Sequence, residues 1–90
     1  MDLGFELREM DSFEKSRAKS EGIVVSSVYK NSSIDNARIE PGFIITKVNG
    51  KKVTTVNELL KLINGYKGKL NISGFYENYP GEFPYVVDVQ

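Results

Sequence analysis

The clearest pattern in the sequence is a turn, an apolar run and a second turn, between residues 39 and 50. Pro41-Gly42 is a strong turn pair, because proline presets φ to about −65° and glycine accepts positive φ. Phe43 to Val48 is apolar and β-branched, which predicts a mostly buried strand. Asn49-Gly50 is the pair favoured in a two-residue type I′ turn, so Lys51-Lys52-Val53 is predicted to return as a short strand.

The N-terminal third alternates between apolar and polar residues and then becomes polar. From Leu3 to Met10, Phe5 and Leu7 stand at alternate positions, which predicts a strand with one buried face. Asp11 to Glu21 is dominated by charge and serine, and it is predicted to be an exposed loop with at most a frayed turn of helix. Apolar residues from Ile23 to Tyr29 predict a second strand that is buried on both faces at its start.

A short helix is expected between the second and third strands. The run Asn31-Ser32-Ser33 supplies side-chain oxygens that can cap a helix from Ile34 to Arg38. Ile34 and Ala37, three positions apart, would then point inward.

The strongest helix pattern runs from Val56 to about Asn64. Thr55 and Glu58 match the capping box, in which a hydroxyl and a carboxylate each bind a free backbone amide. Asn64-Gly65 supplies a left-handed stop.

The apolar arc of this helix is wide, about 160° of its circumference. We expect Leu59 and Leu62 to face the core, while Val56 and Leu60 face something else. The alternative is that Val56 and Leu60 pack under the long N-terminal loop.

Two further strands complete the chain. Leu70 to Tyr76 alternates, Tyr79 to Glu82 is a turn, and Phe83 to Val89 returns as the last strand. Gly74 inside a strand predicts a bulge or a close backbone approach. Many short strands with one dominant amphipathic helix predict a mainly β, α+β domain or a partly open barrel.

Composition and charge narrow the possible functions. Ninety residues are expected to form a single domain over 1–90, excised from a larger protein. Twelve basic and twelve acidic side chains cancel, and the basic pairs Lys51-Lys52 and Lys67/Lys69 are too small for a nucleic-acid footprint. No apolar run approaches the ~18 residues that span a bilayer, so no membrane insertion is expected.

The chain lacks the residue types that most catalytic sites use. It contains no histidine and no cysteine, which excludes Ser-His-Asp and Cys-His sites and the usual zinc sites. Ser16 and Lys19 lie close together, but their charged surroundings would not desolvate the lysine enough to make it a base. We therefore expect no enzyme activity, no metal and no cofactor.

Several stretches resemble the PDZ domain in the circularly permuted order of bacterial HtrA/Deg-type serine proteases. The match to the family's Pro-Gly-Asp-x-Ile-x-x-Val-Asn-Gly signature begins at Pro41 and ends at Gly50, with Phe43 in place of the Asp. The other matching stretches, which keep the family's order, are Leu3-Gly4-Phe5, Gly22 to Val28, Asn31 to Ala37 and Val53 to Ile63. The resemblance implies a PDZ-like, partly open barrel of five to six short strands capped by one long and one short helix.

The resemblance also implies a site. PDZ domains capture an extended peptide, usually a free C-terminus, by adding it as a strand beside a helix. The amides of Gly4 and Phe5 would receive the peptide carboxylate, and Leu3, Phe5, Leu60 and Ile63 would surround its last side chain. Leu7 and Val56 would bound the position two residues upstream, where an apolar residue is favoured. The alternative for Leu3, Phe5 and Leu7 is plain core, and Gly4 fits an ordinary turn glycine equally well.

Three positions depart from the family pattern. Asp2 precedes Leu-Gly, where a carboxylate would repel a peptide carboxylate by about 1 kcal/mol if both are solvated. Arg38 stands where relatives have glycine; because left-handed geometry costs about 1–2 kcal/mol there, we expect the short helix to exit differently. Phe43 removes a capping carboxylate and adds apolar bulk.

The functional expectation is a peptide-binding module. Its partners would be polypeptide C-termini or unfolded segments, together with a protease domain in cis that is not in this chain. The family implies substrate recognition or regulation in protein quality control, in the bacterial periplasm or cell envelope. The alternative is a structural or self-assembly module whose site is occupied by its own parent protein or a sister subunit.

Overall fold

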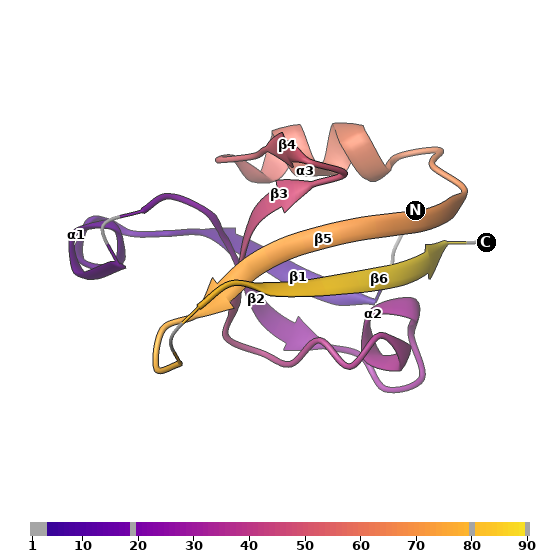
Figure 1. Cartoon of the computed structure of the whole chain (residues 1–90), viewed down its shortest axis with the longest axis horizontal. Coiled ribbons are helices and arrows are strands. Elements are labelled where there is room, and N and C mark those ends of the chain that lie inside the picture. The colour runs from indigo at the N-terminus through magenta and orange to yellow at the C-terminus, as the bar shows by residue number, and fades with distance from the viewer. Residues whose placement is uncertain (1–3, 19, 80, 90) are drawn as a thin grey trace.

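The computed structural model describes residues 4–18, 20–79 and 81–89. This part of the chain forms six strands and three helices (Figure 1). In chain order they are β1 (Phe5–Glu9), α1 (Ser12–Ala18), β2 (Ile23–Val28), α2 (Ser33–Asn36), β3 (Phe43–Val48), β4 (Lys51–Lys52), α3 (Val56–Ile63), β5 (Gly68–Tyr76) and β6 (Phe83–Val89).

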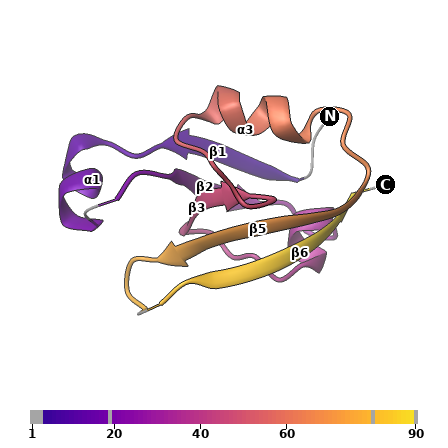
Figure 2. The ribbon, with the colours of Figure 1, turned by 45° about the horizontal axis from the view of Figure 1, so that its top comes forward.

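The strands form one antiparallel sheet in the order β1-β2-β3-β5-β6, with the short β4 paired to β3. β1 and β6 are therefore its two edges. β6 carries Pro84, which has no N–H to donate, and α2 packs beside this strand (Figure 1). α3 lies at the other end of the strand order, along β1 (Figure 2). The mainly β, α+β fold expected from the sequence is confirmed.

Successive side chains of a strand point to opposite faces of the sheet, so the apolar residues divide between two clusters. The larger cluster contains Phe43 of β3 and residues of α2 and α3 such as Ile34 and Leu59. The smaller one consists of Met10, Val24 and Ile44. Its partly buried neighbours are Ala18 and Phe75.

The expectation of an exposed loop over residues 11–21 was wrong, since Ser12–Ala18 form helix α1. Asp11 and Glu14 make a reciprocal cap: the Glu14 N–H donates to Asp11 Oδ1 at 2.9 Å, and the Asp11 N–H donates to Glu14 Oε1 at 3.0 Å. Arg8 binds Glu14 through two 2.7 Å hydrogen bonds. At the other end, Arg17 pairs with Glu77 in the β5–β6 turn. α1 is thus held by its ends and has no fully buried residue among those described.

The turn predicted at Asn49-Gly50 and the close backbone approach predicted at Gly74 are confirmed. Asn49 and Gly50 both have positive φ, 52° and 80°, as the type I′ turn requires. Gly74 lies where β3 approaches β5 most closely: a Cβ there would be 1.9 Å from the Ile44 carbonyl oxygen. The β3–β5 register shifts beside it, between Ile45 and Lys47.

The expectation that the short helix would end without left-handed geometry at Arg38 was wrong. Ser32 caps α2 by accepting from the Asp35 N–H at 3.1 Å, as predicted. Arg38, however, adopts the left-handed geometry that we expected the chain to avoid, with φ of 71°. The reason is that this geometry lets the next amide, of Ile39, reach the Ile34 carbonyl at 3.3 Å and turn Ile39 into the core.

Candidate peptide-binding site

Helix α3 is fixed at its start by the predicted capping box. The Glu58 N–H donates to Thr55 Oγ1 at 3.1 Å, and the Thr55 N–H donates to Glu58 Oε1 at 3.1 Å. Glu58 also accepts from the backbone N–H of Thr54 at 2.9 Å. These hydrogen bonds, led by the one from Thr54, lower the pKa of Glu58. The helix ends at Ile63, and Gly65 then adopts φ of 77°.

Strand β1 has an open side. It pairs with β2, and no other strand of the described residues pairs with it. The Tyr29 N–H donates to the Gly4 carbonyl at 2.7 Å, one residue beyond the Phe5/Val28 pair. In an antiparallel ladder this spacing marks a pair whose own N–H and C=O groups point away from each other. The backbone groups of Phe5 therefore face the open side of the sheet.

α3 is tied to this edge strand at one point. The Val56 N–H, at the first position of the helix, donates to the carboxylate of Glu9 at 3.1 Å. Glu9 is the last residue of β1, so the contact joins the end of the strand to the start of the helix. We use the term β1/α3 site for residues 4–9 together with Val56, Leu60 and Ile63.

The structure gives the predicted site residues three kinds of position. Leu3 lies outside the described residues, as does Asp2. Phe5 and Ile63 belong to the core, with 8% and 2% of their surface exposed. Leu7 and Val56 are half-buried, and Leu60 is 42% exposed.

Gly4 has a structural reason to be glycine. Its φ is 97°, and a Cβ built on it would lie 1.9 Å from Ser32 Cβ. Only glycine fits this close approach, which fixes where β1 begins relative to α2. The roles predicted for the Gly4 and Phe5 amides and for the surrounding side chains remain predictions.

The outer surface of α3 is hollowed next to the predicted site. Leu60 and Ile63 share a cavity of about 380 Å³ with Asn57, Lys61 and Asn64. The stems of such polar side chains can cover an apolar guest while their heads stay in water.

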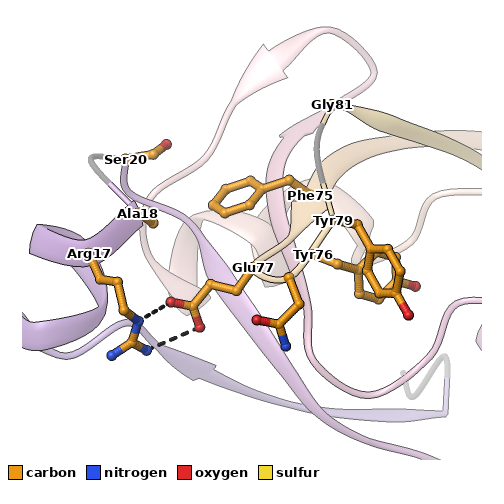
Figure 3. A pocket seen from close by; sticks show the side chains of 9 residues that line it. Arg17, Ala18, Ser20, Phe75, Tyr76, Glu77, Tyr79 and Gly81 are labelled. Carbon is orange, nitrogen blue, oxygen red and sulfur yellow. Dashed lines mark hydrogen bonds and ion pairs between the residues drawn. The ribbon is translucent and has the colours of Figure 1, made fainter.

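A second cavity, of about 640 Å³, was not predicted from the sequence (Figure 3). It lies between the end of α1 and the β5–β6 turn, where the Arg17–Glu77 pair forms one wall. Tyr76 and Tyr79 stand on its other side, with ring centroids 6.2 Å apart and planes at 85° (Figure 3). The signal for it was the cluster of aromatic residues between 75 and 85, which alternation alone assigned to a strand and a turn.

The described residues include no group of three or more acidic, histidine or cysteine side chains placed to hold a metal ion. Among the helices that the structure describes, none combines the length and apolar character needed to cross a bilayer.

An open antiparallel sheet with an edge strand beside a capped amphipathic helix defines a class of small domains suited to strand addition. The family model of the PDZ domain matches residues 2–72, and the chain belongs to this family. The resemblance drawn from the sequence is confirmed. As a PDZ domain, the chain is not itself a catalytic domain.

Solved structures share the fold at low sequence identity. The HtrA3 PDZ domain, crystallised with a phage-derived ligand (FGRWV), is 23% identical with a TM-score of 0.82, over 99% of this chain and 84% of that one. The HtrA-type protease AlgW, solved with a decapeptide, is 16% identical with a TM-score of 0.79, over 97% of this chain. The chain spans 28% of the length of the AlgW chain. A search of curated proteins found no match.

Proposed function

We propose that the β1/α3 site captures C-terminal or extended apolar peptides by strand addition to β1. The observation that carries the proposal is the open side of β1, where the backbone groups of Phe5 face outward beside α3. A guest strand placed there would receive main-chain hydrogen bonds from β1 and apolar contact from Leu7, Val56 and Leu60. The HtrA3 structure, whose fold is similar, holds a peptide ending in valine, which supports this mode.

The wider role follows from the same likeness. The domain would recognise substrates for, or regulate, an HtrA-like serine protease whose catalytic domain lies in the same polypeptide. Protein quality control in the bacterial periplasm or cell envelope is part of this proposal. Detection of the parent protein in an envelope fraction, and of a trypsin-like domain upstream, would test it.

Titration with the pentapeptide FGRWV tests the peptide mode directly. We expect a dissociation constant near ~10 µM, as in a modest strand-addition complex. Amidation of the peptide C-terminus should weaken binding about 10-fold to 100-fold, because charge-assisted hydrogen bonds contribute about 1.5–3 kcal/mol.

One result would narrow the proposal, and another would count against it. Equal binding of the free and amidated peptides would remove the carboxylate from the mechanism and leave capture of extended segments. No binding of any apolar peptide, together with self-association that grows with protein concentration, would favour the alternative of a self-assembly module.

A further inference from the structure

A third hollow, separate from the β1/α3 site, lies where β3 begins and where β5 turns into β6. We call it the aromatic pocket, with a volume of about 410 Å³. Its walls are Glu40, Pro41, Tyr76, Tyr79, Phe83 and Tyr85. Four of these six residues are aromatic, so most of the wall consists of ring faces and edges. None of the six belongs to the β1/α3 site, so a ligand could bind this pocket whether or not β1 accepts a peptide.

The rings of the pocket are held in place from below. Phe43, fully buried, contacts the rings of Tyr76 and Tyr85 at centroid distances of 5.0 Å each. Phe83 contacts Tyr76 at 5.4 Å. Phe43 occupies the position where the family signature has Asp. In this chain the side chain at that position is a ring that supports the aromatic cluster, and not a carboxylate.

Hydrogen bonds fix the hydroxyl groups as well. The hydroxyl oxygens of Tyr76 and Tyr85 are 2.8 Å apart and share a hydrogen bond. Tyr76 also accepts from the Glu40 N–H at 3.2 Å, which places Glu40 at the mouth of the pocket. Burial and the bond to Tyr76 raise the pKa of Tyr85, so its hydroxyl stays neutral and available as a polar partner.

The negative charge of the Glu40 carboxylate has no cationic partner among the described residues. The Glu40 side chain is exposed, and no cationic group of the described residues lies within ion-pair distance of its carboxylate. Aromatic ring faces carry negative electrostatic potential. Tyr79, 63% exposed, offers its ring to a guest. Ring faces and a carboxylate around one hollow favour an organic cation.

We infer that the aromatic pocket binds the side chain of an arginine from a partner polypeptide. The guanidinium is planar, so it can stack on a tyrosine ring while its N–H groups donate to the Glu40 carboxylate. It is also less strongly hydrated than an ammonium, which lowers the cost of entering an aromatic site. Charge complementarity thus selects the guest, and the Phe43-supported rings orient it.

The test is an NMR titration of the 15N-labelled 90-residue chain with acetyl-Gly-Arg-Gly-amide. The amidated terminus keeps this probe from acting as a ligand with a free C-terminal carboxylate, so failure here and failure of the proposed function are distinguishable. We expect shifts of the backbone amides of Glu40, Tyr76, Tyr79 and Tyr85. The matched probe replaces arginine by citrulline, which has the same shape and no charge. It should bind about 5-fold to 30-fold more weakly.

Variants locate the contact. Tyr79→Leu, a change of an exposed residue, should weaken arginine binding at least about 5-fold. Glu40→Gln should weaken it and reduce its salt dependence. Phe13→Leu, which removes an exposed ring on α1, is the matched control and should leave binding unchanged. A dispersed spectrum shows that each variant is folded.

Three outcomes would overturn the inference. The first is no shift at these amides up to about 20 mM peptide, a concentration that detects very weak binding. The second is equal binding of the citrulline probe, which would mean apolar packing without charge recognition. The third is unchanged arginine affinity in both folded Tyr79→Leu and folded Glu40→Gln.

Discussion

The carboxylate of Glu9, at the end of the edge strand β1, accepts a hydrogen bond from the backbone N–H of Val56 at 3.1 Å. This N–H belongs to the first turn of α3, where amides have no partner within the helix. A carboxylate at that position also interacts favourably with the helix dipole. One side chain thus caps the helix and fixes its start against the strand that a guest peptide would join.

Replacement of Glu9 should therefore affect stability more than an average surface change. We expect Glu9→Ala to lower the free energy of unfolding by about 1 kcal/mol, the usual cost of losing a helix cap. Urea denaturation followed by circular dichroism measures this. Glu82→Ala removes an exposed carboxylate that makes no contact with a donor among the described residues, and it should change stability by less than about 0.5 kcal/mol. Equal effects of the two variants would contradict the cap.

Leu60 offers a test of the β1/α3 site that spares the fold. Because the side chain is 42% exposed, Leu60→Lys should change the free energy of unfolding by less than about 1 kcal/mol. Peptide affinity should fall at least about 10-fold, since a guest would have to pack against an ammonium group. Val86→Lys on the outer face of β6 is the matched control, because Val86 is also an exposed apolar residue. Isothermal titration with FGRWV compares the peptide affinities of the two variants. Equal losses of affinity would mean that the peptide binds away from Leu60.

Arg38 stores backbone strain that glycine would relieve. At φ of 71°, a non-glycine residue costs about 1–2 kcal/mol, while glycine has a larger entropy loss on folding of about 0.4–1 kcal/mol. Arg38→Gly should thus stabilise the domain by roughly 0.5–1 kcal/mol, visible as a higher melting temperature. The same change in the middle of α3, Lys61→Gly, should destabilise it by about 1 kcal/mol. A destabilised Arg38→Gly would mean that the arginine side chain contributes more than its backbone strain costs.

Helix α1 should respond to acid. The hydrogen bonds from Arg8, and then that from the Asp11 amide, lower the pKa of Glu14 from 4.5 to about 2. A carboxyl group with a lowered folded-state pKa stabilises the fold above its unfolded pKa and loses this contribution as pH falls through the folded value. Stability should therefore decline between about pH 5 and pH 2, by no more than about 1 kcal/mol for this surface pair.

Thermal melts across this pH range test the effect. Glu14→Gln or Arg8→Met should reduce the slope. A remaining slope is expected, because hydrogen bonds from Thr54 and from Arg17 also lower the pKa values of Glu58 and Glu77. An unchanged slope in both variants would contradict the assignment.

Patterns that are local in sequence predicted local structure well. The Asn49-Gly50 turn, the Thr55–Glu58 capping box and the tight contact at Gly74 all appear as expected. A few neighbouring residues fix the turn and the capping box, through φ preferences and paired hydrogen bonds. Gly74 could be singled out because glycine has no Cβ, although its contact is with Ile44 on another strand.

Features that depend on distant partners were missed. The Asp11-x-x-Glu14 cap was present in the sequence, but α1 is held by Arg8 and Glu77, which lie outside its own apolar pattern. Left-handed geometry at Arg38 follows from the burial of Ile39 and not from the preference of arginine. The aromatic pocket could not be predicted without knowing that the residues before β3 meet the end of β5 and the start of β6.

The two outer strands of the sheet, β1 and β6, differ in how readily they could accept a strand from another molecule. Pro84 interrupts the donors of β6, and α2 stands beside that strand, whereas the border along β1 stays receptive. A strand that pairs with β1 would therefore not be the β6 strand of a second copy, so the sheet would not extend from one molecule to the next. The arrangement favours a one-to-one complex over filaments.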